Sequence, residues 1–111
     1  MDYRIEKRSD AAVVSVQGRV DESTWVAFGV GLSDGIEQAH AAGLKRMIID
    51  LADLAYMSSR GLRVLTVAKR EGQEAGVEVE LASPNDVMRE ILAISRYDKL
   101  FKITETVEAA P

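Results

Sequence analysis

The chain has 111 residues, a hydrophobic fraction of 47%, a charged fraction of 29% and a formal net charge of −4. This size predicts one domain over residues 1–111, which can bury a core of its own. The lack of cysteine and the single histidine, His40, exclude disulfides, thiolate zinc sites and histidine-rich metal sites, and we expect no cofactor. The acidic balance argues against a nucleic-acid partner.

Membrane insertion is not expected either. No apolar run approaches the roughly 20 residues that a membrane-spanning helix needs. The first residues lack the apolar stretch of a signal peptide, so we expect a cytoplasmic location.

The first segments predict a hairpin. Residues 3–8 alternate large and charged side chains, as an edge strand does. A turn signal at residues 9–11 separates them from the β-branched run Val13 to Val16, which we expect to end at Gly18.

A helix is expected next, with the carboxylate of Asp21 capping its free N–H groups. Gly43 supplies the stop. Large apolar side chains at steps of three or four define one face: Trp25, Phe28, Leu32, Ile36 and Ala39. Three glycines in this stretch weaken an isolated helix by roughly 1 kcal/mol each relative to alanine. They are Gly29, Gly31 and Gly35. The helix must therefore depend on packing or be partly irregular.

The apolar run 47–49 predicts a strand buried on both faces, which ends at Asp50. We expect residues 51–57 to form a short connection. A second helix should begin near Ser59 and run to about Ala75, before Gly76.

The last third of the chain predicts one more strand, helix and strand. Residues 77–81 alternate as a strand with one wet face. Ser83 is the expected cap of a third helix and Pro84 its first residue. The expected apolar stripe of that helix consists of Val87, Ile91 and Ile94. Residues 101–103 resemble a short final strand, and the last residues should be frayed.

This order, β-β-α-β-α-β-α-β, predicts an α/β fold. Alternation of strands and helices implies a mixed, mostly parallel sheet with right-handed crossovers and helices packed on it. The opening hairpin adds an antiparallel edge at the N-terminal end.

Four short segments, in this order, carry a resemblance to a known family. They are residues 18–21 (Gly-Arg-Val-Asp), 47–51 (Met-Ile-Ile-Asp-Leu), 56–65 (Tyr-Met-Ser-Ser-Arg-Gly-Leu-Arg-Val-Leu) and 97–101 (Tyr-Asp-Lys-Leu-Phe). Together they resemble the STAS domain, the family of bacterial anti-sigma factor antagonists and the related domain of sulfate transporters. The likeness covers nearly the whole chain and implies a single STAS-like domain that regulates transcription by partner switching.

The resemblance also implies a role for the serine turn, which we define as residues 57–62. In the antagonists, a serine of this turn is phosphorylated by an anti-sigma factor that is also a serine kinase. Gly61 and Leu62 set the register, so Ser59 takes the phosphorylated position. Ser58 stands where aspartate is common, and Arg60 replaces a small residue. A phosphatase is a further candidate partner.

The physical setting of the turn suits a switch. The hydroxyl of unmodified Ser59 can cap the second helix. A phosphate there adds about −1.5 to −2 charges, which a helix N-terminus and nearby arginines tolerate. A partner interface over the turn would have to bury that charge. We predict phosphorylation at Ser59 and a partner-binding site made of Asp21, Met57, Ser58, Ser59, Arg60, Gly61 and Arg63.

Three other interpretations stay open at this point. The two serines can be simple helix caps. The chain can be a STAS adaptor subunit of a transport or signalling complex that is never phosphorylated. Asp21, Asp50 and the serines can converge on a small ligand at one end of the sheet. Catalysis is not expected, because no nucleophile motif such as Gly-x-Ser-x-Gly is present.

Overall fold

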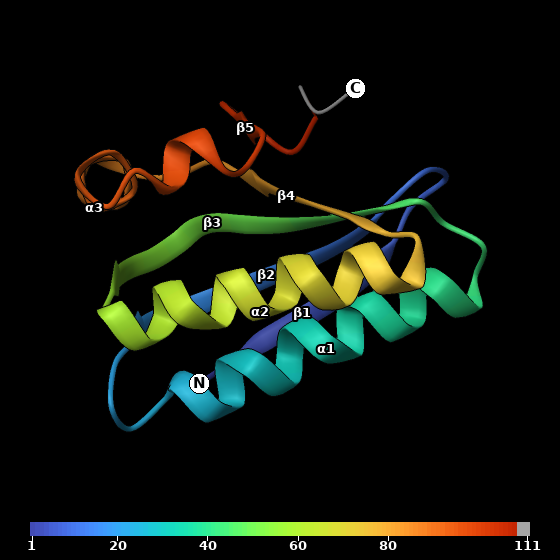
Figure 1. The fold of residues 1–111 in the computed structure, drawn as a ribbon, viewed down its shortest axis with the longest axis horizontal. Coiled ribbons are helices and arrows are strands. Elements are labelled where there is room, and N and C mark those ends of the chain that lie inside the picture. The colour runs from blue at the N-terminus through green and yellow to red at the C-terminus, as the bar shows by residue number, and fades with distance from the viewer. Residues whose placement is uncertain (109–111) are drawn as a thin grey trace.

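The computed structural model describes residues 1–108 of the chain. A mixed sheet runs through the middle of the molecule (Figure 1). The strands follow the order β1-β2-β3-β4-β5, with one antiparallel pair, β1 with β2, and parallel pairs beyond it. Their bounds are β1 (Tyr3–Lys7), β2 (Ala12–Val20), β3 (Arg46–Met57), β4 (Glu78–Ala82) and β5 (Ile103–Thr104). The predicted fold class, with its antiparallel N-terminal edge, is confirmed.

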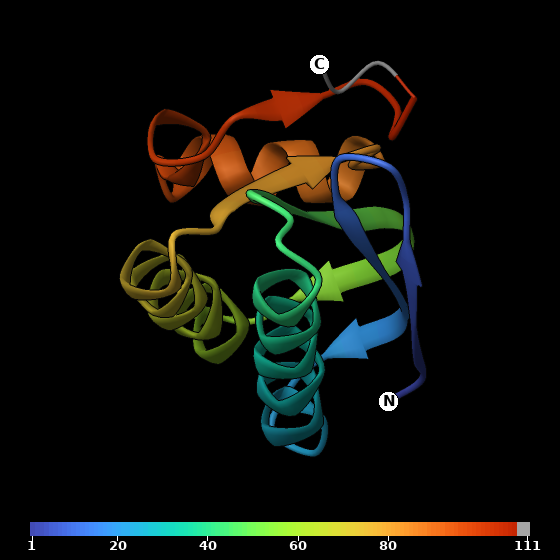
Figure 2. The ribbon, with the colours of Figure 1, turned by 90° about the vertical axis from the view of Figure 1, so that its right-hand side faces the viewer.

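Two long helices, α1 (Trp25–Ala41) and α2 (Ser59–Ala75), lie side by side along the sheet. Figure 2 looks down both of them and shows α3 (Asp86–Ile94) running crosswise near β4. A short 3-10 turn, Tyr97–Lys99, leads from α3 toward β5. The main core lies between the sheet and the helices, and a small second cluster on the other face gathers Ala11, Val13, Ile48, Ala82 and Val107.

The glycines of α1 are explained by packing. The helix is regular from Trp25 to Ala41, so it depends on its contacts and is not irregular. A Cβ at position 35 would lie 2.5 Å from Cγ2 of Val14 and 2.7 Å from the sulfur of Met47. Only a residue without a side chain lets the helix approach the sheet this closely, so the lost helix propensity is offset by burial.

The predicted connection over residues 51–57 is wrong, because these residues form the second half of β3. Irregularities in the pairing with β2, between Ser15 and Gln17 and between Gly18 and Arg19, break the two-residue alternation that marks a strand. Leu51, Leu54 and Met57 are consequently buried at steps of three. The predicted end of β2 at Gly18 is wrong for the same reason, and the strand continues to Val20.

The third helix begins later than predicted. Ser83 is not its cap, since its backbone has φ 60°, and Pro84 precedes the helix. The side chain of Asn85 accepts from the N–H of Met88 at 2.8 Å and caps α3. This start places Met88 and Leu92 in the core, whereas Ile91 packs at its margin.

The predicted apolar stripe of that helix is therefore partly wrong. The side chains of Val87 and Ile94 are 51% and 76% exposed. The final strand also differs: it is Ile103–Thr104 and not residues 101–103. The expected fraying at the end of the chain falls partly on residues 109–111, which lie outside the described residues.

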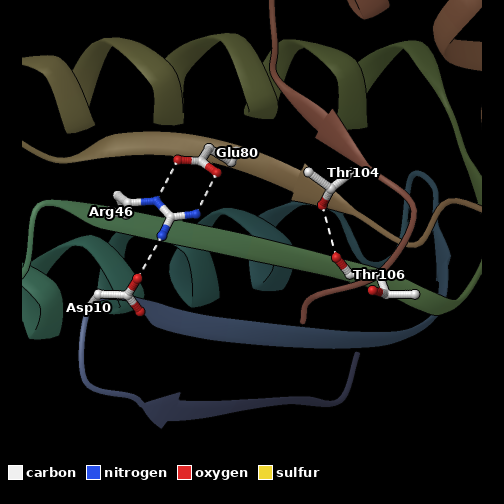
Figure 3. Close-up of polar contacts among 5 residues, drawn as sticks. All are labelled: Asp10, Arg46, Glu80, Thr104 and Thr106. Atoms are coloured by element: carbon white, nitrogen blue, oxygen red, sulfur yellow. Dashed lines mark hydrogen bonds and ion pairs between the residues drawn. The ribbon is translucent and has the colours of Figure 1, made fainter. Parts of the chain in front are cut away.

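The predicted wet face of β4 is wrong at Glu80, which is 1% exposed. Arg46 donates to both carboxylate oxygens of Glu80, at 2.8 and 3.0 Å, and to Asp10 at 3.0 Å (Figure 3). The hydrogen bond to Glu80 is the main reason that the pKa of Arg46 lies above its ordinary value. A buried carboxylate in a strand is tolerated because a bidentate guanidinium neutralises it.

We expect Arg46→Met to lower the free energy of unfolding by about 3 kcal/mol, because it leaves the Glu80 carboxylate buried without a partner. Urea denaturation measures this loss. The double variant Arg46→Met/Glu80→Leu should recover more than half of it. Arg89→Met is the control, since Arg89 and Glu105 form an exposed pair worth at most about 1 kcal/mol. A loss no larger than the control's would contradict the role given to the buried pair.

We expect opposite effects from alanine at two glycines of α1. Gly35→Ala should destabilise the protein by about 1–3 kcal/mol, because the new Cβ overlaps Val14 and Met47. Gly29→Ala should stabilise it by up to about 1 kcal/mol, since the nearest atom to its Cβ is Cγ1 of Val64 at 3.7 Å. Thermal unfolding of both variants tests the pair, and equal shifts in Tm would contradict the packing account.

Candidate functional site

The candidate site lies where β2 and β3 end and α1 and α2 begin. Val20 and Met57, the last residues of the two strands, are paired in register. The N–H of Ser58 donates to the carbonyl of Val20 at 2.9 Å and ties the two turns together. The serine turn therefore lies directly beside the turn that contains Asp21, as the partner-binding prediction requires.

The two serines of the turn have different settings. Ser58 has an extended backbone and occupies the N-cap position of α2, but its hydroxyl makes no capping hydrogen bond. That hydroxyl is buried and has no hydrogen-bond partner among the described residues. Ser59 is exposed and is the first residue of α2. The predicted capping role of the Ser59 hydroxyl is therefore wrong, whereas its side chain is open to a modifying enzyme.

Met57 and Gly61 lie beneath the turn. Met57 is 2% exposed and Gly61 is buried. A Cβ at position 61 would collide with Cγ of Met57 and lie 2.7 Å from Cγ1 of Val20. A glycine is needed here for the start of α2 to rest on the strand ends. Both residues shape the turn from below and present little surface of their own.

The two arginines that follow Ser59 differ in their contacts. The guanidinium of Arg60 lies 3.1 Å from the carboxylate of Glu22 and 5.1 Å from the ring centre of Trp25. Arg63 is exposed, and within residues 1–108 it makes no ion pair or hydrogen bond. Arg60 thus links α2 to the turn before α1, and the charge of Arg63 is available to a ligand.

Asp21 holds the turn before α1, but it does not cap the helix as predicted. The helix begins at Trp25, and Thr24 occupies its N-cap position. The carboxylate of Asp21 instead accepts from the backbone N–H and the hydroxyl of Ser23, at 3.0 and 2.8 Å. The helix starts late because this turn over residues 21–24 satisfies its own polar groups before α1 begins.

Asp50 lies away from the site, so the prediction that it converges with Asp21 and the serines is wrong. It sits within β3, where it accepts from the hydroxyl of Ser15 at 3.3 Å. Seven further residues of β3 follow it, or about 23 Å of strand. A ligand site built from all four residues is excluded by this distance.

A groove of about 1040 Å³, which was not predicted from the sequence, opens at Ser59 and runs between α1 and α2. Its lining includes Trp25, which the periodicity placed in the core and which is only partly buried. The sequence feature that could have indicated the groove is a second apolar stripe on α1. It consists of Val26 and Val30, four residues apart on the face away from the sheet.

The fold and the site define a class of protein: a small α/β domain with an exposed serine at a strand-to-helix turn. Residues 2–110 match the STAS domain family. The chain therefore belongs to the STAS domain family. In the described part of the chain, every helix is too short or too polar to cross a membrane.

Similar proteins include anti-sigma factor antagonists. BtrV of Bordetella bronchiseptica, named as one, is 26% identical over 110 residues, 99% of this chain and 91% of its own. A solved antagonist from Mycobacterium paratuberculosis is 26% identical with a TM-score of 0.73, covering 96% of this chain and 87% of that one.

The antagonist SpoIIAA shares the fold. Its unphosphorylated form superposes with a TM-score of 0.76 at 20% identity, over 98% of this chain and 92% of its own. A structure of its phosphorylated form superposes with a TM-score of 0.68. The chain thus resembles anti-sigma factor antagonists in sequence and in fold.

We expect the carboxyl group of Asp21 to titrate below its ordinary pKa of 3.8, because hydrogen bonds from Ser23 stabilise the carboxylate. The bonds stabilise the folded turn fully above pH 3.8 and are lost as the pH falls through the lowered pKa of the folded state. A carbon-13 NMR titration of the Asp21 carboxyl group measures this pKa. Ser23→Ala should raise the pKa toward 3.8, and a wild-type midpoint at or above 3.8 would contradict this geometry.

Proposed function

We propose that this protein is an anti-sigma factor antagonist that binds an anti-sigma factor with serine kinase activity, and that phosphorylation of Ser59 releases the partner. The exposed hydroxyl of Ser59 on the first residue of α2 carries this proposal. Ser58, the other serine of the turn, has a buried hydroxyl that a kinase cannot reach without opening the turn. The contrast selects Ser59 as the modified residue.

The start of α2 can hold a phosphate without unfolding. The first N–H groups of a helix point at such a site and favour negative charge. Arg63 lies four residues after Ser59, one helical turn away, and has no other ionic partner among the described residues. A phosphate on Ser59 would gain charge-assisted hydrogen bonds from both sources.

The switch then acts on binding. A partner that covers the turn must take the surface of Ser59 out of water, and a phosphate dianion makes that step costly. In this proposal Asp21, Arg60 and Arg63 contact the partner around Ser59, and Ser58 fixes the turn. Met57 and Gly61 position the surface from below and touch the partner little. That SpoIIAA has been solved both unphosphorylated and phosphorylated supports a phosphate on a chain of this fold.

One observation favours the second candidate, a STAS adaptor subunit that is never phosphorylated. Arg60 replaces the small residue expected beside Ser59, and its contacts to Glu22 and Trp25 hold a bulky side chain next to the hydroxyl. A kinase active site would have to displace it. In that case the turn would be a permanent contact surface, and mass spectrometry of protein from native cells would find no phosphate at Ser59.

We expect Ser59→Asp to weaken binding of the anti-sigma factor partner at least tenfold, because a charge enters the interface, whereas Ser59→Ala should bind within about twofold of wild type. Isothermal titration calorimetry measures both. Val87→Asp on α3 is a matched control, since it places the same charge on an exposed valine outside the site. Incubation with the partner and ATP should phosphorylate wild type at Ser59 but not Ser59→Ala. Equal binding of Ser59→Asp and wild type would contradict the proposed switch.

A further inference from the structure

The groove between α1 and α2 faces away from the sheet and leaves apolar side chains uncovered. Val26 and Val30 on α1 and Val67 on α2 are 58, 56 and 53% exposed and line it. Trp25 and Val64 contribute further apolar surface. Figure 1 shows the two helices side by side. The valines of both helices line the same groove. Contiguous exposed apolar surface of this kind is typical of an interaction site.

The groove is built into the packing of the two helices. Gly29 faces Val64, and the missing side chain deepens the floor between the helices. Farther along, the hydroxyl of Ser33 donates to the carboxylate of Glu71 at 2.9 Å and joins α1 to α2. The walls are therefore held in place before any ligand arrives, which lowers the entropy lost on binding.

The two ends of the groove carry opposite charge. Arg60 and Arg63 line the end at the serine turn, and Asp34 and Glu37 line the other end. Among residues 1–108, neither Arg63 nor Glu37 makes an ion pair. Both helices also begin at the arginine end, so their dipoles point the same way and add to the positive potential there.

We propose that this groove binds an amphipathic α-helix of a protein partner that runs antiparallel to α1 and α2. Its apolar stripe packs on the valines, an acidic side chain near its C-terminus pairs with Arg63, and a basic side chain near its N-terminus pairs with Glu37. The antiparallel direction follows from the dipoles, because the negative end of the partner helix then meets the arginines. The inference rests on the proposed function, since it assigns the mode by which that partner is recognised.

The dimensions and charges fit a helix better than a lipid chain. From Trp25 to Glu37 the groove follows thirteen residues of α1, about 18 Å from the first to the last, which is the length of three to four helical turns. A fatty acid would place its carboxylate on the arginines, but its hydrocarbon end would then face the unpaired carboxylate of Glu37. A helix with apolar residues at steps of three and four satisfies both ends.

The position of Ser59 links the groove to the switch. Ser59 lines the mouth of the groove at the arginine end. A phosphate there would attract Arg63 and repel the acidic end of the bound helix. Phosphorylation would thus remove a favourable charge and add an unfavourable one at the same point.

Selection from a display library tests the inference directly. The library consists of 14-residue helical peptides whose side chains are randomised on all faces of the helix. They are selected for binding to the whole 111-residue protein. Trp25, the single tryptophan, reports binding through its fluorescence. We expect the selected peptides to share an apolar stripe, acidic residues in the C-terminal half and basic residues in the N-terminal half.

Variants then locate the binding. Val30→Glu should weaken the selected peptides at least tenfold, and Val87→Glu, an equally exposed valine on α3, should leave their affinity within twofold. Arg63→Glu should reverse the preference for an acidic C-terminal half. Circular dichroism confirms that each variant is folded. Binding that depends on Val30 but is equal in wild type and Ser59→Asp supports the groove and counts against the phosphorylation switch.

Three results would overturn the inference. One is that selected peptides bind Val30→Glu as well as wild type, or that no peptide is enriched. Another is that dodecanoate binds the groove and displaces the peptides, which would make it a lipid site. The third is that sedimentation velocity shows a dimer of the protein that Val30→Glu abolishes, which would make the groove a contact between two copies.

Discussion

The close contact between the start of α2 and the ends of β2 and β3 determines the structure around the serine turn. Gly61 makes it possible, because a side chain at this position would overlap Met57 and Val20. The contact brings the serine turn beside the Asp21 turn, where the N–H of Ser58 bonds to Val20. It buries one serine hydroxyl and leaves the other exposed. The proposal that Ser59 is the phosphorylated residue therefore rests on packing as well as on sequence register.

The buried ion pair and the serine turn lie at opposite ends of β3. Arg46, the first residue of the strand, forms the buried ion pair with Glu80, and Met57, the last residue, supports the serine turn. Eleven residue steps along the strand separate the two residues. Substitutions at Arg46 or Glu80 should change the free energy of unfolding, whereas substitutions at the serine turn should change the affinity for a partner. Little coupling is expected between the two.

The sequence predicted the order of strands and helices along the chain and the two long helices, because these depend on local periodicity and glycine stops. It failed where tertiary contacts overrule local pattern. The irregular pairing of β2 and β3 hid half of β3, which misplaced Asp50 at the site. The third helix is capped by Asn85 and begins after Pro84, so α3 buries a different face from the predicted apolar stripe. Glu80 looked exposed because its partner, Arg46, lies 34 residues away. The groove was hidden because only the pairing of α1 with α2 brings its valines together.

The central claim is that phosphate on Ser59 changes partner binding and leaves the fold intact. The most direct measurement is a calorimetric titration of the anti-sigma factor with protein carrying authentic phosphoserine at position 59, compared with unmodified protein of the same unfolding midpoint. The account predicts at least a tenfold loss of affinity while the free energy of unfolding changes by less than about 1 kcal/mol. Equal affinity, or a loss of affinity that merely follows unfolding of the phosphorylated protein, would contradict it.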